Sequence, residues 1–247
     1  MIPKKIHYIW FGKKKKNKLI KKCIQSWLNL LPEWEIIEWN EDNYDVNSNK
    51  YISEAYNAGR YAFAADYARF DILYKHGGIY LDTDVELLRP IPHEFLLDEG
   101  FTGVESNYLV NPGLIFGCNK KNGIVKEILD EYNKTSFIIN GRENLKTVVL
   151  FTSDVLARHG FTPDNTEQCI NNIRIYPMEY FCCYDSDVKE FYITDKAISV
   201  HRYANSWGSN KEKITLKVKM LVKRIIGVDR YRKLLKTKRG IKEIIKK

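Results

Sequence analysis

The segment from residue 61 to residue 84 constrains the fold more than any other part of the chain. Residues 61–76 are rich in Ala and Tyr and contain neither Gly nor Pro, so they predict a helix that ends at Gly77-Gly78. Ile79-Tyr80-Leu81 follows as a very short apolar strand and runs directly into Asp82-Thr83-Asp84. A helix, a buried strand and a carboxylate pair in immediate succession indicate an α/β sheet with a ligand site at the end of a strand.

The carboxylate pair has the chemistry of a cation site. In extended backbone, residues two apart project to the same side, so we expect Asp82 and Asp84 to face one point while Thr83 faces away. Two such carboxylates repel each other, and a hard divalent cation, Mg²⁺ or Mn²⁺, relieves that repulsion. The alternative is a pair of solvated acids in a turn. An apolar run directly before the pair argues against that alternative, because a loop tip would carry polar residues.

Short apolar runs alternate with helical patterns along the first 207 residues. This alternation predicts one α/β domain over residues 1–207, with a sheet flanked by helices. Strands are expected at residues 6–11, 34–39, 101–104, 114–118, 174–176 and 197–200, and further helices at residues 20–31, 124–132 and 143–158.

The positive charge is concentrated at the end of the chain. The formal net charge is +9, but residues 211–247 alone carry +12. Because the basic surface does not belong to the domain, the composition argues against nucleic-acid binding. Apolar residues recur at helical spacing among these lysines, so residues 208–247 predict a basic amphipathic helical tail. Such a helix either lies on an anionic membrane surface or packs on the domain with a solvated basic face.

The cysteines and the N-terminus predict a cytoplasmic protein. The five cysteines form no CxxC pair and are expected to be reduced thiols. No apolar run reaches the roughly 20 residues of a membrane-spanning helix, and the first residues lack the apolar core of a signal peptide. A tail bound to lipid would place the protein peripherally at the inner face of the plasma membrane.

Several other residues are candidates for a ligand site. Asp66 and Arg69 lie three apart on one helix face, where they form either an ordinary surface ion pair or contacts to sugar hydroxyls and phosphate. Trp10, at the end of the first strand, is either a core residue or a platform for a base. His201, at the end of the last strand, is either structural or a ligand. Ser206-Trp207 lie in a polar, aromatic loop that would suit sugar recognition.

Three blocks of the chain resemble glycosyltransferase family 32 and the related catalytic domains of glycosylating toxins. The central block comprises Ala65-Asp66-Tyr67-Ala68-Arg69, Leu73-Tyr74 and the residues 77–84, and it resembles the DXD-containing sugar-binding region of that family. Residues 6–12 are similar to the first strand of the group, and residues 201–207 to its C-terminal active-site segment. The family includes capsular polysaccharide glycosyltransferases and initiating mannosyltransferases.

The resemblance implies a GT-A fold with a mixed sheet, a nucleotide-sugar donor, Mn²⁺ or Mg²⁺, and retention of anomeric configuration. Carried over by position, the resemblance assigns donor contacts to seven residues. Trp10 would stack on the base, Asp66 and Arg69 would contact the sugar or the ribose, and Tyr80 would support the nucleotide. Asp82 would contact the ribose, and Ser206 and Trp207 would hold the diphosphate.

The metal ligands implied by the resemblance are Asp84 directly, Asp82 through water, and His201 as a further metal or diphosphate contact. One departure concerns Ser206 and Trp207, which are adjacent here, whereas one residue separates this Ser and Trp in the toxin pattern. No residue is assigned as a covalent nucleophile.

The expected function is therefore transfer of a hexose from a nucleotide sugar, UDP-linked in preference to GDP-linked, to a glycan or lipid-linked acceptor in surface polysaccharide or capsule biosynthesis. A sugar-1-phosphate nucleotidyltransferase is one alternative, but it should open with a glycine-rich phosphate loop, and Gly12 is the only glycine before Gly59. A non-catalytic basic adaptor is another, and it leaves the block at residues 77–84 unexplained.

Overall fold

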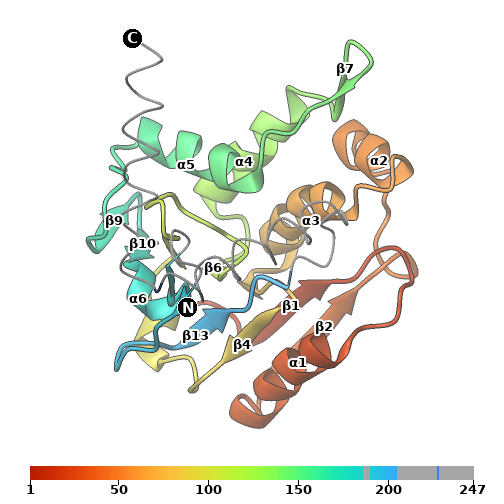
Figure 1. The fold of residues 1–247 in the computed structure, drawn as a ribbon. Coiled ribbons are helices and arrows are strands. Elements are labelled where there is room, and N and C mark those ends of the chain that lie inside the picture. Colours follow the sequence, from red (N-terminus) through yellow and green to blue (C-terminus); the bar gives the residue numbers. More distant parts are fainter. Residues whose placement is uncertain (186–189, 205–226, 228–247) are drawn as a thin grey trace. The chain divides into compact units, whose positions relative to one another are not determined.

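The computed structural model describes residues 1–185, 190–204 and 227 (Figure 1). Residues 1–183 and 193–204 form one compact unit. Ser206, Trp207 and the predicted tail at 208–247, apart from Gly227, lie outside the described residues, so the predicted domain boundary stays a prediction. Within the described ranges, every helix is too short or too polar to cross a bilayer.

The compact unit is built on a mixed sheet. Strand β1 is parallel to both of its neighbours, β2 and β3, whereas β6 and β9 run against the strands beside them. The predicted α/β fold with a mixed sheet is thereby confirmed. Because β1, β2 and β3 are parallel, their carboxyl ends share one edge of the sheet. Across the described residues the strand order is β2 (Glu35–Trp39), β1 (Lys5–Ile9), β3 (Gly78–Tyr80), β6 (Phe116–Cys118), β5 (Gly100–Gly103), β10 (Ile173–Tyr176) and β9 (Gln168–Ile170).

Helices cover the sheet on both sides. Helix α1 (Lys18–Leu30) packs on β4 (Val85–Leu87), while α3 (Tyr61–His76) packs on β1 and β3. Figure 1 shows α1 and α3 on opposite sides of the parallel strands. The helices α2 (Lys50–Asn57), α4 (Gly123–Asn133) and α5 (Val148–Arg158) pack around α3. Two shorter helices are η1 (His93–Leu96) and α6 (Met178–Phe181).

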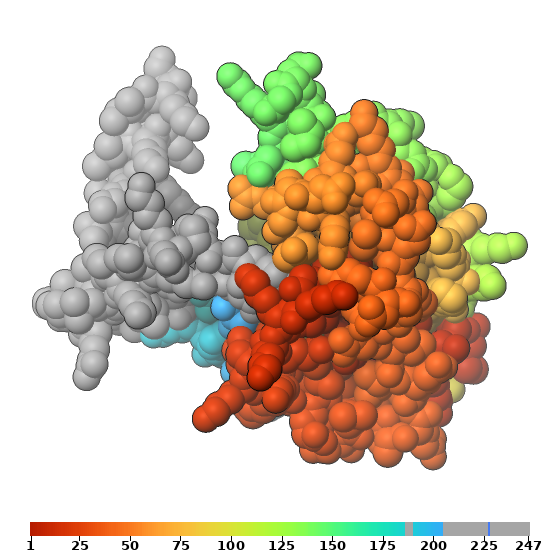
Figure 2. Space-filling model, turned by 90° about the vertical axis from the view of Figure 1, so that its right-hand side faces the viewer, coloured from red at the N-terminus to blue at the C-terminus, as the bar shows by residue number. Residues whose placement is uncertain are grey.

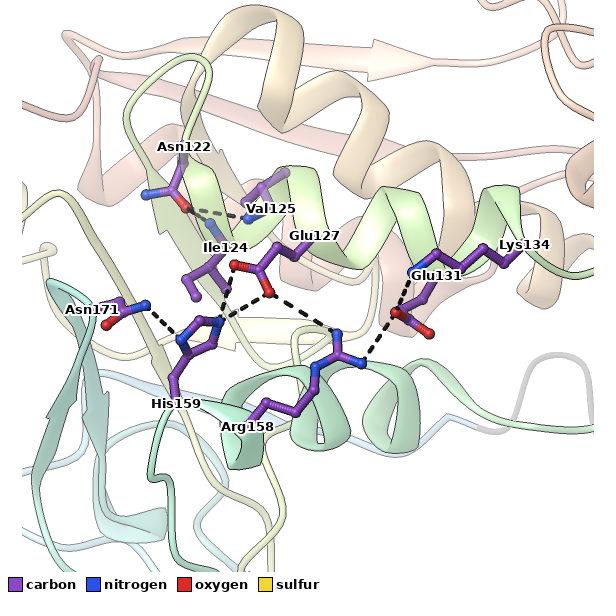
Figure 3. A network of polar contacts seen from close by, with 9 residues as sticks. All are labelled: Asn122, Ile124, Val125, Glu127, Glu131, Lys134, Arg158, His159 and Asn171. Atoms are coloured by element: carbon purple, nitrogen blue, oxygen red, sulfur yellow. Dashed lines mark hydrogen bonds and ion pairs between the residues drawn. The ribbon is translucent and has the colours of Figure 1, made fainter.

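A polar network ties α4 to α5 (Figure 3). The side chain of Asn122 accepts hydrogen bonds from the first backbone N–H groups of α4 and so caps that helix. Glu127 then contacts His159 at 3.0 Å, and Glu131 accepts a 3.1 Å bond from Arg158. Asn171, in the turn between β9 and β10, bonds the other ring nitrogen of His159 at 2.8 Å. This network fixes the helices that pack against α3.

Three two-stranded pairings complete the described structure. Strand β13 (Ser199–His201) pairs antiparallel with β4, with His201 opposite Val85. Strands β7 (Ile138–Ile139) and β8 (Arg142–Glu143) form a hairpin, and β11 (Tyr184–Asp185) pairs with β12 (Glu190–Phe191). The β13–β4 pair matters most for the site, because it returns the chain to the end of the DXD motif.

The predicted elements agree with the structure in kind, but some bounds differ and several short elements, among them β4 and β9, were not predicted. The predicted helix at 143–158 begins only at Val148, because residues 142–143 belong to β8 and Thr147 caps the helix. His201 lies inside β13 rather than after it. Helix α2 was not predicted. Its apolar positions are few, and its N-cap, Asn49, stands in a polar stretch typical of a loop.

A buried histidine joins β1 to the end of α3. His7 is 0% exposed, accepts a hydrogen bond from the Trp39 indole at 3.1 Å through Nδ1, and donates through Nε2 to the Gly77 carbonyl at 2.9 Å. The indole N–H can only donate, so the imidazole is neutral. Burial lowers the pKa of His7 to about 4, from an ordinary value of 6.5.

We expect His7 to make the fold acid-sensitive. Between pH 6.5 and about 4 the unfolded chain binds a proton at His7 that the folded chain does not. The contribution of neutral His7 to the free energy of unfolding is therefore fully present above pH 6.5 and is lost as the pH falls towards 4. The full contribution is roughly 3 kcal/mol. Urea unfolding of wild type and His7→Asn from pH 7.5 to 4.5 measures it. The variant should lose stability less steeply, by about 1.4 kcal/mol per pH unit. Equal slopes would contradict the prediction.

Candidate metal centre and donor site

The Asp82-Thr83-Asp84 motif lies in a turn that follows β3. The Val85 N–H donates to the Asp82 carbonyl at 3.0 Å and closes the turn, and the Asp82 N–H donates to the Gly113 carbonyl at 3.0 Å. The prediction that strand alternation aligns the two carboxylates is therefore wrong in its geometry. The two side chains do meet at one point, but a turn rather than a pleated strand brings them there.

His201 completes a cluster of three metal-ligating side chains. One ligand atom each from Asp82, Asp84 and His201 lies within 4.8 Å of the others. The His201 Nε2 atom is 3.2 Å from Asp84 Oδ1 and 3.8 Å from Asp82 Oδ2. Register explains this convergence, because β13 pairs with β4 and sets His201 opposite Val85, the residue that follows the motif.

The strand that carries His201 also holds Asp84 in place. The backbone N–H of Ala204 donates to Asp84 Oδ2 at 2.8 Å, and that of Arg202 donates to the Asp84 carbonyl at 2.9 Å. Asp84 Oδ2 is thereby occupied, and Oδ1 faces His201. The Tyr203 ring packs edge-on against the imidazole, with the ring centroids 4.2 Å apart.

His201 is buried, Asp82 and Asp84 are half-buried, and the cluster is strongly polarised. Burial alone would lower the pKa of His201, but Asp84 and Asp82 outweigh it and raise the pKa to about 10. Burial alone would raise the pKa of Asp84, and His201 together with the Ala204 N–H lowers it to about 2. Two carboxylates and one imidazole nitrogen at a single point form a donor set that fits a divalent cation.

A second group of charges adjoins the cluster through Asp82. Arg69 Nη2 lies 2.6 Å from Asp66 Oδ1 and 3.4 Å from Asp82 Oδ1. The Tyr80 hydroxyl donates to Asp82 Oδ1 at 3.0 Å, and the Arg69 guanidinium lies 4.6 Å from the centre of the Tyr80 ring. The structure thus connects four of the predicted site residues in one contact chain.

The pair of Asp66 and Arg69 is not a surface ion pair. The two residues are 9% and 3% exposed on α3. Burial raises the pKa of Asp66 to about 6, although Arg69 opposes that rise. Among the described residues, Arg69 Nη1 is buried without a hydrogen-bond partner. A buried guanidinium with a free donor beside the cluster is suited to bind a polar ligand.

Trp10 lies directly after β1. It is 7% exposed, its indole N–H donates to the Lys14 carbonyl at 2.6 Å, and Lys16 Nζ lies 5.4 Å from the ring centroid. Burial agrees with the core alternative for this residue, while its place at the carboxyl edge of β1 agrees with the donor-base alternative. The remaining predicted site residues, Ser206 and Trp207, lie outside the described part of the chain.

Two residues that sequence reasoning missed also shape the site, Ala204 and Gly113. A side chain at Gly113 would overlap the Asp82 carboxylate, so only glycine leaves room for the observed position of Asp82. Neither residue type carries a chemical signal. In the sequence, only the position of Gly113 just before a predicted strand hinted at a role.

We expect Gly113→Ala to displace the Asp82 carboxylate and to weaken Mn²⁺ binding about 10- to 100-fold, as loss of a supporting contact typically does. Gly123→Ala is the matched control, since its added methyl would meet nothing within 4 Å. Equilibrium Mn²⁺ titration of both folded variants measures the difference. If Gly113→Ala binds Mn²⁺ as Gly123→Ala does, the close approach has no role at the site.

Comparison with known proteins agrees with this geometry. Residues 17–102 match the family model for the "glycosyltransferase sugar-binding region containing DXD motif". That segment includes Asp66, Arg69, Asp82 and Asp84. Residues 17–102 thus carry the sugar-binding region that is typical of DXD-type glycosyltransferases. The predicted resemblance to the DXD-containing sugar-binding region is confirmed, and the mixed α/β sheet places the DXD motif directly after one of its strands, as expected.

Two curated relatives are similar to part of the chain. Inositol phosphoceramide mannosyltransferase 3 of Schizosaccharomyces pombe is 36% identical over 106 residues, which are 37% of this chain and 28% of the relative. Subversion of eukaryotic traffic protein A of Legionella pneumophila is 27% identical over 162 residues, 52% of this chain and 24% of the relative. The aligned segments thus span about a quarter of the length of these two relatives.

Among solved structures, the PaToxG glycosyltransferase resembles the chain with a TM-score of 0.44 and 18% identity, covering 64% of this chain and 69% of that one.

Proposed function

We propose that the domain transfers a hexose from a nucleotide sugar in a metal-dependent reaction. The observation that carries the proposal is the convergence of Asp82, Asp84 and His201 beside the buried pair of Asp66 and Arg69. The first group has the donor atoms for Mn²⁺ or Mg²⁺, and the second has the hydrogen-bonding groups for a sugar. A bound cation would neutralise the diphosphate of the donor as it becomes the leaving group.

The protein side chains bind and orient the donor. Ala204 fixes the Asp84 carboxylate so that one oxygen remains for the cation, and Arg69 and Tyr80 do the same for Asp82. The free Nη1 donor of Arg69 is suited to a sugar or ribose oxygen. Prior fixation of these groups reduces the reorganisation needed during the reaction.

We further propose retention by a route without a covalent intermediate. The acceptor oxygen bonds to the anomeric carbon on the face from which the diphosphate leaves, and the acceptor proton passes to that diphosphate. Support comes from the side chains of the site, since Asp66, Asp82 and Asp84 are all held in ion pairs. A carboxylate committed in this way is a poor nucleophile, so the paired-carboxylate mechanism of glycosidases is not invoked.

The proposed donor and acceptor are those that the family resemblance implies. A UDP-sugar is the favoured donor, and a GDP-sugar is the second choice. Trp10 would contact the base. Ser206 and Trp207, which lie beyond the described residues, would contact the diphosphate. The acceptor is a glycan or a lipid-linked sugar in surface polysaccharide or capsule biosynthesis. The cytoplasmic location and membrane attachment through residues 211–247 belong to the same proposal.

A panel of UDP- and GDP-sugars with Mn²⁺ tests the function. Purified protein should release nucleotide slowly from one donor, and EDTA should stop the release. Equilibrium binding of UDP and GDP in the presence of Mn²⁺ accompanies the assay, because hydrolysis without an acceptor can be slow. If neither nucleotide nor any of the sugars binds with metal present, the proposed function is wrong.

A further inference from the structure

The hairpin between α4 and α5 exposes apolar side chains. Its strands β7 and β8 meet at Asn140-Gly141, whose positive φ angles of 51° and 72° are those of a tight two-residue turn. Figure 1 shows the hairpin projecting past α2 and α4. Its apolar side chains are well exposed: Ile138 37%, Ile139 46%, and Leu145 61%, with Leu150 at the start of α5 at 42%.

The hairpin is held rigidly at its base. Phe137 is fully buried and packs against Phe63, with ring centroids 5.2 Å apart. The Ile138 N–H donates to Glu54 on α2 at 2.8 Å, and Glu143 pairs with Arg60 at 2.8 Å. The structure therefore presents the isoleucines to solvent from a fixed base, although burying them would be favourable.

A run of exposed lysines follows β1. Lys13, Lys14 and Lys15 are exposed in the loop after β1, and Lys18, the first residue of α1, is exposed as well. In the described part of the chain Lys16 pairs with Glu38 at 2.8 Å, whereas Lys13, Lys14 and Lys15 form no ion pair. This loop is called the lysine loop below. It begins at the carboxyl edge of the parallel strands, the edge where the DXD motif also lies.

Contacts through the start of α3 place the lysine loop near the hairpin. Gly12 lies against the ring of Tyr61. Arg60, the residue before Tyr61, pairs with Glu143 of the hairpin. Figure 2 shows the red N-terminal segment and the green hairpin region exposed on one face of the molecule, with orange residues between them. An apolar projection and the lysine loop thus share a surface.

We propose that the β7–β8 hairpin and the lysine loop together form a docking surface for an anionic lipid membrane. Ile138 and Ile139 are neighbours in one strand and point to opposite faces of the hairpin, yet both are exposed. A flat protein partner could cover only one of them, whereas a lipid interface surrounds the tip and buries both. Arg142, exposed opposite Ile139, can extend its guanidinium to the phosphates, and the flexible lysines match a diffuse anionic surface.

Docking in this way sets the carboxyl edge of β1–β3 towards the lipid. The acceptor would then be a saccharide or hydroxyl group carried on a membrane lipid. This consequence rests on the proposed transfer reaction, whereas the docking itself does not. It uses only described residues and is separate from any attachment through residues 211–247.

Vesicle co-sedimentation of the full chain tests the proposal. Wild type should bind vesicles of phosphatidylcholine with phosphatidylglycerol and should not bind phosphatidylcholine alone. Ile138→Ser with Ile139→Ser should lower the partition coefficient about ten-fold, from the lost apolar burial. Lys13→Ser, Lys14→Ser and Lys15→Ser together should lower it roughly 100-fold, since each lysine near the surface contributes about a five-fold factor.

Matched controls lie at the opposite edge of the sheet. Leu97 is 60% exposed and serves as the apolar control through Leu97→Ser. Its position follows from its neighbour Leu96, whose carbonyl accepts a hydrogen bond from the Ile2 N–H just before β1 begins. The charge control combines Lys4→Ser, Lys120→Ser and Lys121→Ser. Each control should lose much less vesicle binding than the surface variant that it matches. Every variant keeps residues 205–247, so any binding through that segment is the same in all.

A dye that reports polarity provides a second measurement if a variant fails to fold. Ile139→Cys, labelled in a chain with the exposed Cys169 replaced by Ser, should show a blue shift on anionic vesicles. The proposal is wrong if wild type binds no vesicle or if both surface variants bind vesicles like wild type. It is also wrong if the controls lose as much binding as the surface variants, or if the dye shows no blue shift on anionic vesicles. Donor binding in solution is unaffected in each of these cases, so the proposed function is judged separately.

Discussion

Asp84→Asn is expected to lower the rate of nucleotide release from the donor by roughly 10²- to 10⁴-fold, the size of effect expected when a cation that stabilises the leaving group is lost. The substitution preserves shape and removes the charge. Asp84 Oδ1 lies 3.2 Å from His201 Nε2, so the variant loses both a cation ligand and the partner that orients the imidazole. Mn²⁺ affinity should fall together with kcat/KM.

Asp42→Asn is the control for this substitution, since Asp42 is exposed in the loop after β2. Both variants should keep the far-ultraviolet circular dichroism of the wild type. Retention of wild-type turnover and wild-type Mn²⁺ binding in Asp84→Asn would remove the DXD motif from the reaction and with it the proposed function.

Arg69→Met is expected to cost about 3–5 kcal/mol of the free energy of unfolding, because it leaves Asp66 buried without its partner. Asp66 Oδ1 and Arg69 Nη2 are only 2.6 Å apart and nearly inaccessible to water. Urea denaturation at pH 7.5 measures the loss. Adding Asp66→Asn to the variant should recover a large part of it, since the uncompensated charge is then absent.

An exposed ion pair gives the comparison for this prediction. Arg60→Met breaks the pair with Glu143, in which the Arg60 side chain is 52% exposed, and should cost at most about 1 kcal/mol. A loss in Arg69→Met no larger than that in Arg60→Met would show that the buried pair does not stabilise the fold.

Much of the fold could be predicted because its signals are local. Helix α3 has the predicted bounds, since a stretch without Gly or Pro ends at two glycines with φ angles of 66° and 98°. The buried strands read as short apolar runs. The start of α5 was missed because the hairpin before it has strands of only two residues, too short for an alternating pattern.

The site was harder to predict because its parts meet through long-range pairing. The DXD motif stood out as a carboxylate pair, but the turn that orients it depends on contacts with Gly113. Local pattern alone favoured a structural role for His201, and only the family resemblance suggested a ligand. The burial of Asp66 and Arg69 reflects packing of the helices around α3, which spacing along one helix cannot show.

The bond between Ala204 and Asp84 joins residues 120 positions apart, so about half of the 247-residue chain separates the two parts of the candidate cation site. A chain that stops before residue 199 has both aspartates but lacks the strand that brings His201 and Ala204 to them. During synthesis, then, the DXD motif emerges from the ribosome long before its remaining ligand. Prematurely terminated products would carry α3 and the DXD motif and still be unable to assemble the cluster of Asp82, Asp84 and His201.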